Sequence, residues 1–445
     1  MKSKFGLSII MLLIPAAWFA GMVLLALAGK GLHAVLGLDV YLWLGLPGLL
    51  LCGLFLRAQP KRRGTAGLIL LAVIAGLYLV EFAALFVVPN SANIKDRRWK
   101  AAKKMGITYD RREPAEALVD LRREDETITL TYTPLLNQYI ATEQNGGTPF
   151  IPLSGRSNRK TILRNERGDY AVYQSDRYGF RNPMDLSWDN PPDAMIVGDA
   201  FAIGCSVPDG EEASGQLRRL GRTVHNLGRL GSGPLLALGT MREYGPTLKP
   251  KHVFWFFYEG TDLTGLANEQ RVKTLKSYLD PTFSQKLIDR QEDVDALCDR
   301  MDRLQLTGFV KRNDKVRRLM QFVKLRRSIM LLRKSKGFTP PDGLFDELMG
   351  QAKQCAESWG GELVFVYLPG SMRYSSKSLP DHEFHRPDIL QRVQTLDIPV
   401  IDLCLRFERE DDPLGFYPYR LPGHYTPEGY GLVAEEIVDW LNQKP

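Results

Sequence analysis

Four short segments of this sequence combine glycine with polar side chains, and three of them carry groups capable of acid–base chemistry. Three of them begin where an apolar run ends, and the fourth precedes an apolar helical pattern: residues 197–204, 226–233, 258–263 and 423–430. Together they carry the carboxylates of Asp199 and Asp262 and the imidazole of His424. A histidine can accept the proton of a nucleophilic hydroxyl, and backbone N–H groups can stabilise the resulting oxyanion. The segments are therefore candidates for one site of acid–base chemistry.

The elements around these segments predict an α/β domain with a parallel sheet. Short apolar runs alternate with helical patterns, which is typical of βαβ units with helices on both faces of the sheet. The predicted strands are 194–197, 223–227, 252–258, 362–368 and 399–403, and the predicted helices are 211–220, 234–244, 343–359, 388–395 and 427–441. Sites in such sheets form at the carboxyl ends of the strands. Asp199 and Asp262 both follow predicted strands.

As a set, the four segments closely resemble the sequence blocks of the SGNH/GDSL hydrolase family, over about residues 190–445. The resemblance implies an SGNH-type three-layer domain and assigns positions to roles. Ala200 occupies the position of the serine nucleophile, and His424 that of the general base. Gly231 and Thr261 occupy the positions of the two oxyanion donors.

Three positions depart from the family pattern. Ala200 has no hydroxyl, and Thr261 stands where the family has an asparagine. The aspartate usually found two or three residues before the histidine is absent, because Pro422 and Leu421 stand there. An engineered serine-to-alanine change accounts only for the first departure, whereas natural loss of catalysis accounts for all three. Both explanations remain open from the sequence.

Other chemically competent side chains receive a structural interpretation. Cys205 and Ser206 lie beyond the turn that presents residue 200, so neither is favoured as a substitute nucleophile, and His225 lies on a buried strand. The cysteines are widely spaced, with no CxxC or Cys/His cluster, so we expect no zinc site and no cofactor. Four of them lie outside the apolar N-terminal region and allow two disulfides or none: Cys205, Cys298, Cys355 and Cys404.

Charge and hydropathy point to a membrane anchor rather than to nucleic acid. The 445-residue chain has a formal charge of +7, and residues 1–90 contribute seven cations against Asp39 and Glu81, which is +5. The excess positive charge therefore surrounds apolar segments, which excludes the simplest interpretation as a nucleic-acid-binding protein. Apolar stretches at about 5–28, 38–56 and 67–88 are each long enough to cross a bilayer. A cleavable signal peptide is the alternative for the first stretch.

The cations of the loop 57–63, with Lys2 and Lys4, favour a cytoplasmic loop and place residues 90–445 outside the cytoplasm. Cations between Lys95 and Lys104 oppose this orientation, but long domains translocate largely regardless of charge. Glu81 lies within the third stretch, where a carboxylate is costly. It therefore either faces a membrane partner or polar cavity, or stays neutral or bonded among the three helices.

The soluble part contains two further regions. Residues 90–190 form a leading subdomain with a predicted helix at 114–124 and a predicted strand at 127–132, and residues 263–340 form a mostly helical insertion. Within the insertion, Lys311 to Lys336 carries eleven cations interleaved with apolar residues. Such a segment is predicted either to lie on an anionic membrane surface or to pack as a solvated helical insertion.

The expected architecture is a three-helix transmembrane anchor (1–89) and the leading subdomain, followed by an SGNH-like domain (191–445). Similar membrane-tethered domains of the SGNH/GDSL family, including those of bacterial alginate acetylation, move acyl groups on envelope polysaccharides. The resemblance implies an acyl-ester hydrolase or O-acyltransferase of the bacterial inner membrane, with its C-terminal domain periplasmic, that is inactive or impaired because of Ala200. The alternative is a non-catalytic module that binds the glycan or a polysaccharide-assembly partner.

Overall fold

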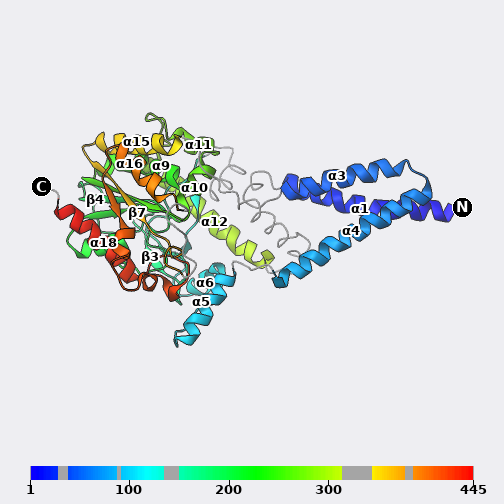
Figure 1. Cartoon of the computed structure of the whole chain (residues 1–445), viewed down its shortest axis with the longest axis horizontal. Coiled ribbons are helices and arrows are strands. Elements are labelled where there is room, and N and C mark those ends of the chain that lie inside the picture. Colours follow the sequence, from blue (N-terminus) through cyan, green and yellow to red (C-terminus); the bar gives the residue numbers. More distant parts are fainter. Residues whose placement is uncertain are drawn as a thin grey trace. The chain divides into compact units, whose positions relative to one another are not determined.

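The computed structural model describes residues 2–28, 39–87, 92–134, 150–312, 343–375 and 384–443 (Figure 1). The chain divides into two compact units. Unit 1 comprises Met1–Asn90 and Phe309–Gly337, and unit 2 comprises Ser91–Gly308 and Phe338–Pro445. The predicted basic segment Lys311 to Lys336 lies almost entirely outside the described residues, so its membrane-surface interpretation stays a prediction.

Unit 1 is built from three apolar helices that pack on one another: α1 (Lys2–Ala28), α3 (Asp39–Leu56) and α4 (Pro60–Val87). Within the described residues, two stretches, Gly6–Leu24 and Pro60–Ala83, are long and apolar enough to cross a membrane, whereas the apolar part of α3 is shorter, at Leu44–Leu56. Glu81 is fully buried within this unit.

The loop predicted at 57–63 is shorter than expected, because α4 already begins at Pro60. The three cations that follow Pro60 therefore lie in the first turn of α4 rather than in the loop. Proline at the first helical position loses no hydrogen bond, since that N–H has no partner within the helix.

A five-stranded parallel sheet forms the centre of unit 2. Its strands are β4 (Ala194–Val197), β5 (Val224–Asn226), β6 (His252–Tyr258), β7 (Glu362–Leu368) and β8 (Val400–Asp402), in the order β5-β4-β6-β7-β8. All neighbours are parallel, which confirms the α/β class predicted from the alternating apolar runs. The order reverses between β4 and β6, and ligands bind at such a switch point in doubly wound sheets.

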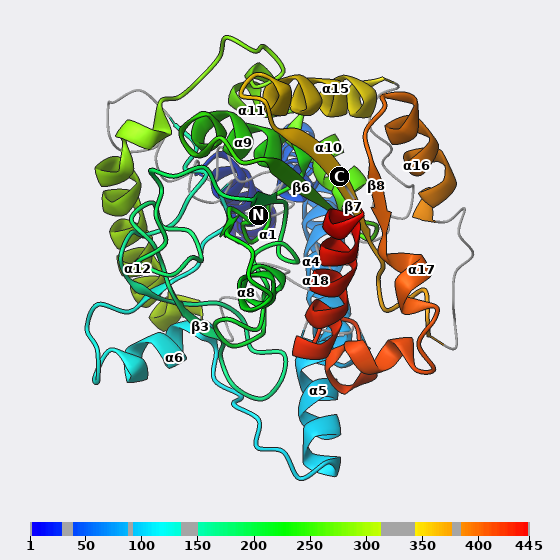
Figure 2. The same ribbon diagram turned by 90° about the vertical axis from the view of Figure 1, so that its left-hand side faces the viewer.

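Helices cover both faces of this sheet, as Figure 2 shows. Successive residues of a strand point to opposite faces, and Trp255 and Phe257 of β6 accordingly enter one apolar cluster while Phe254 and Phe256 enter the other. The first cluster is covered mainly by α9 (Pro234–Leu248), α15 (Leu344–Glu357) and α16 (Arg386–Thr395). The second is covered by α8 (Ala213–Arg219), α17 (Leu403–Phe407) and α18 (Pro427–Asn442).

The leading subdomain carries a small separate sheet. It contains α5 (Ala92–Lys104), α6 (Pro114–Leu121), β1 (Thr129–Leu130), β2 (Lys160–Ile162) and β3 (Val172–Gln174). Strand β1 pairs parallel with β2, and β2 pairs antiparallel with β3. The strand predicted at 127–132 is thus only two residues long, because only Thr129 and Leu130 align with β2.

The insertion is helical where the structure describes it. It contains α10 (Asp262–Glu269), α11 (Lys273–Ser277), the 3-10 turn η1 (Leu287–Asp289) and α12 (Gln291–Arg312). Helix α12 joins the leading subdomain through Met301, which packs with Leu118 and Leu130, and through Asp295, which pairs with Arg156 at 2.5 Å. Two 3-10 turns, η3 (Pro413–Phe416) and η4 (Pro418–Arg420), precede the final helix.

Candidate functional site

The first two motifs meet at the carboxyl ends of β4 and β5. The Arg229 N–H donates to the Gly198 carbonyl at 3.1 Å, so the loop after β5 lies directly on the turn after β4. A Cβ at Gly228 would lie 2.3 Å from the Ile203 nitrogen, and Gly198, with φ of +144°, would place one 2.7 Å from the Phe256 carbonyl. Glycine at these positions therefore permits the close approach of two backbones.

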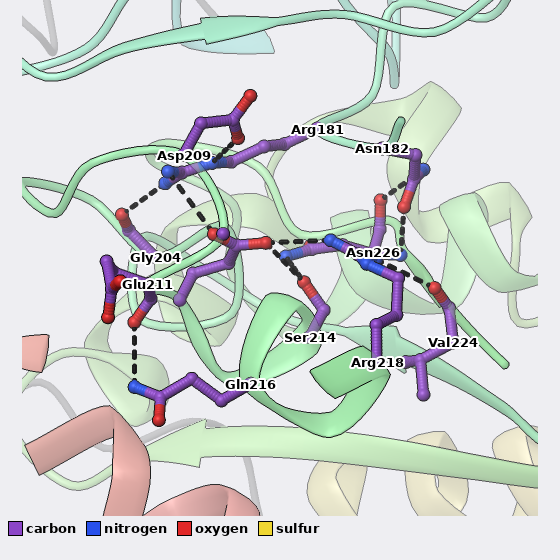
Figure 3. A network of polar contacts seen from close by, with 12 residues as sticks. Arg181, Asn182, Gly204, Asp209, Glu211, Ser214, Gln216, Arg218, Val224 and Asn226 are labelled. Carbon is purple, nitrogen blue, oxygen red and sulfur yellow. Dashed lines mark hydrogen bonds and ion pairs between the residues drawn. The ribbon is translucent and has the colours of Figure 1, made fainter. Parts of the chain in front are cut away.

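A polar network that includes residues of β5 and α8 supports this turn (Figure 3). Arg181 donates to the Gly204 carbonyl at 2.7 Å and to the Val207 carbonyl at 3.0 Å, and its charge is paired with buried Glu212 at 3.3 Å. The Asn226 side chain donates to the Ala202 carbonyl at 2.8 Å. Because most of these groups are buried, the network holds the turn at the end of β4 in one conformation.

The third and fourth motifs reach the same turn through Phe201. Its ring centroid lies 4.2 Å from that of Tyr258, at the end of β6, and 4.7 Å from that of His424. His424 lies just before α18, which begins there because Pro427 occupies its first turn and the Thr426 hydroxyl accepts the Gly429 N–H at 3.3 Å. All four predicted motifs thus converge at the switch point of the sheet.

The position predicted for a nucleophile, residue 200, has apolar surroundings. Ala200 is 7% exposed and packs in a cluster with side chains of the leading subdomain and of the loop after β5, including Leu163, Tyr173 and Leu230. Thr261 is exposed and lies at the N-terminus of α10. Gly231 has a φ of +73°, and its backbone lies against the side chain of Thr133. No hydrogen bond connects Thr261 or Gly231 to Ala200 or His424 in the part of the chain that is described.

Asp199 and Asp262 form a pair of buried, interacting carboxyl groups. Asp199 accepts the Phe201 N–H at 2.8 Å, and Asp262 accepts the Tyr258 N–H at 3.0 Å. Burial raises the pKa of Asp199 to about 6, against the effect of the Phe201 N–H and the charge of His424. Burial, and then the charge of Asp199, raise the pKa of Asp262 well above its usual range. The pair can therefore hold a proton near neutral pH.

His424 has an acidic partner that the sequence did not reveal. The carboxylate of Glu166, in the turn between β2 and β3, accepts the His424 backbone N–H at 2.8 Å and lies 3.2 Å from the imidazole Nδ1. The second contact is an ion-pair contact without the alignment of a hydrogen bond. Burial raises the pKa of Glu166, but the charge of His424, the charge of Arg98 and the His424 backbone N–H together outweigh burial and hold this pKa well below its usual range. The aspartate of the family pattern is absent from the positions before His424, and the carboxylate beside the imidazole comes instead from Glu166.

Arg98 of α5 completes this arrangement. Its Nη2 lies 3.1 Å from Glu166 Oε1 and donates to the Pro422 carbonyl at 2.7 Å, and both side chains are almost fully buried. A Cβ at Gly423 would lie 2.6 Å from Arg98 Nη2 and 2.7 Å from Glu166 Oε2. The buried ion pair therefore encloses the segment that carries His424.

The remaining candidate nucleophiles are buried. Burial, followed by the charge of Glu166, raises the pKa of the Cys205 thiol to about 12. The Ser206 hydroxyl is buried and donates to Glu166 at 3.3 Å and to the Cys205 carbonyl. His225 is 1% exposed, and burial, with the charges of two arginines, lowers its pKa to about 3. All five cysteines are described and free.

No protein-family profile and no curated protein matches the chain. Within the described residues, no group of three or more histidine, cysteine or acidic side chains is arranged to hold a metal ion. The fold and the side chains at the switch point are therefore the basis for a functional proposal.

Proposed function

We propose that this chain is an SGNH-type protein of the acyl-ester hydrolase or O-acyltransferase class whose covalent step is disabled by Ala200. The observation that carries the proposal is His424, positioned beside the turn after β4 and supported by the buried carboxylate of Glu166. A base that is itself oriented by a carboxylate is the arrangement that serine acyl transfer uses.

With serine at position 200, the proposed chemistry has a role for each group. His424 accepts the hydroxyl proton as the serine oxygen bonds to the ester carbonyl carbon, and Glu166 stabilises the imidazolium. The N–H groups of residue 200 and Gly231, with the Thr261 hydroxyl, receive the oxyanion. The imidazolium then returns the proton to the leaving alkoxide, and water or a glycan hydroxyl takes the acyl group. Asp199 and Asp262 lie just after β4 and β6, beside the turn that carries residue 200, and their protonation sets the negative charge near the site.

A second candidate is a non-catalytic binding module, and the environment of Ala200 favours it. The Ala200 side chain packs among apolar groups of the leading subdomain, so the position fits a methyl group. In this alternative the same switch-point surface binds a cell-envelope glycan, or a polysaccharide-assembly partner, without turnover.

The proposed setting is the inner membrane of a bacterium. Helices α1 and α4 contain the two stretches long and apolar enough to cross a membrane, and we propose α3 as a third span. An odd number of spans, with the cations of residues 57–63 in the cytoplasm, places the domain after residue 90 outside it. Reporter fusions after residue 100 test this topology, and activity only of a cytoplasmic reporter would overturn it.

The catalytic proposal is tested by Ala200→Ser in the full chain, assayed with a small acetyl ester alongside the unaltered protein and Ala200→Ser with His424→Ala. Loss of a serine nucleophile lowers turnover by roughly 10⁶-fold. We therefore expect no serine-dependent turnover from the unaltered chain, activity from Ala200→Ser, and loss of that activity in the double variant. An inactive Ala200→Ser protein that folds normally and binds acetylated polysaccharide would favour the binding module instead.

A further inference from the structure

Helix α5 has one face that packs on the domain and one that does not. Arg98 and Ala102 are buried, and Lys95 pairs with Glu113 at 3.1 Å. The opposite face carries four exposed cations that form no ion pair with any residue the structure describes: Arg97, Lys100, Lys103 and Lys104. These four cations are named the outer face of α5 below.

The surroundings of the outer face add little negative charge. The single acidic residue of α5, Asp96, is paired with Arg111 at 3.1 Å. The Arg111 guanidinium in turn lies over the Trp99 ring, with its carbon 4.4 Å from the ring centroid. The outer face is therefore a concentrated positive patch rather than one half of a surface salt-bridge network.

Exposed apolar side chains continue this patch. Met105 is 64% exposed and Ile107 is 42% exposed, directly after the end of α5. A soluble polyanion would need only the cations of this patch for binding. A membrane surface offers anionic headgroups for the cations and an apolar layer for the exposed apolar side chains. Basic side chains beside exposed apolar ones are the pattern of segments that lie in the membrane interface.

Chain connectivity keeps α5 close to the end of an apolar helix. Helix α4 ends at Val87 and α5 begins at Ala92. The five intervening peptide steps span at most about 18 Å when fully extended. Any membrane crossed by α4 therefore has its surface within reach of α5, whichever side the domain occupies.

We propose that the outer face of α5 binds the headgroups of anionic phospholipids, with Met105 and Ile107 entering the headgroup boundary. Each cation brought to such a surface raises the binding constant by roughly fivefold. Because Arg98 on the opposite face pairs with Glu166, the same helix contacts both the lipid and the segment that holds His424. The proposal requires that α4 spans the membrane, as proposed above, but not that the site is catalytic.

The test is hydrogen–deuterium exchange of the full chain in nanodiscs, followed by mass spectrometry of peptides covering residues 92–108. We expect several-fold slower exchange in phosphatidylglycerol nanodiscs than in phosphatidylcholine nanodiscs, with the difference reduced at high salt. Replacing all four outer-face cations with Gln should abolish the difference. The matched control replaces four other exposed lysines with Gln and should preserve it: Lys249, Lys273, Lys276 and Lys286.

Equal exchange in the two kinds of nanodisc would overturn the proposal. So would protection by soluble polygalacturonate in neutral nanodiscs without protection by anionic lipid, because the helix would then be a polysaccharide-binding surface. Ester hydrolysis by the Ala200→Ser protein in detergent is a separate readout, so failure of the lipid proposal is distinguishable from failure of the catalytic one. Thermal unfolding of the four-cation variant checks that its domain is intact.

Discussion

Glu166→Gln tests whether the buried carboxylate supports both the fold and the base. The side chains of Glu166 and Arg98 are 5% and 8% exposed, and Glu166 also accepts the backbone N–H of His424. Removing one partner of a buried ion pair typically costs about 3–5 kcal/mol, because the remaining charge is left uncompensated. Glutamine keeps one acceptor oxygen, so we expect a loss near the lower limit, about 3 kcal/mol.

This loss depends on pH with a defined sign. The pKa of Glu166 in the folded protein lies below the ordinary value of 4.5. The ionised carboxylate therefore stabilises the fold fully above pH 4.5, and this contribution is lost as the pH falls towards the folded-state value. The difference in unfolding free energy between the unaltered chain and Glu166→Gln should accordingly be largest from about pH 6 upwards and shrink below about pH 4.

Thermal unfolding of the detergent-solubilised chain between about pH 2 and pH 8 measures the effect, and about 3 kcal/mol corresponds to roughly 4 °C for a unit of this size. A matched control is Asp302→Asn, which disrupts a second carboxylate–arginine pair, in which Asp302 is buried and Arg122 is partly exposed. In the Ala200→Ser background, Glu166→Gln should lower turnover by about 10³–10⁴-fold, as expected for a carboxylate that orients a histidine base. Asp302→Asn should leave turnover largely unchanged. Unaltered stability and an unaltered pH profile in Glu166→Gln would refute the assignment.

Three further predictions concern the same region. Gly423→Ala should destabilise unit 2 by about 1–3 kcal/mol in thermal unfolding, because its Cβ would displace the buried Arg98–Glu166 ion pair. Gly350→Ala in α15, where a Cβ meets nothing within 4 Å, should be neutral or stabilising, and equal effects of the two changes would contradict this packing. Asp262→Asn should become increasingly stabilising as the pH rises above about 4, because the raised pKa of Asp262 keeps its proton in the folded state while the unfolded chain releases it. Unfolding of both proteins across this range measures the difference in stability, and a constant difference would contradict the raised pKa. The thiol of Cys205, with a pKa of about 12, should resist iodoacetamide at pH 8 until the chain unfolds, and mass spectrometry of the labelled peptide would expose any early reaction.

Local sequence pattern predicted the scaffold well. The runs at 194–197, 252–258 and 362–368 are the strands β4, β6 and β7 with the expected bounds, because a strand buried on both faces must be continuously apolar and must end at polar or glycine residues. The same reasoning placed Asp199 and Asp262 at strand ends, and the carboxyl ends of parallel strands share one edge. Convergence of the three motifs that follow strands was therefore predictable without coordinates, whereas for the segment of His424 it was only implied by the resemblance.

Tertiary structure alone decided how the site is completed. Glu166 lies 258 residues before His424, in a turn whose local sequence gives no sign of a partner, and only the packing of the leading subdomain brings its carboxylate to the imidazole. The apolar packing around Ala200 likewise depends on Leu163 and Tyr173, which belong to that subdomain. Periodicity and turn chemistry act over a few residues, so they determine elements and their ends. The pairing of a buried carboxylate with a histidine depends on how segments that are distant in the chain pack together. An ion buried without a partner is costly, so the packing that provides a partner is favoured.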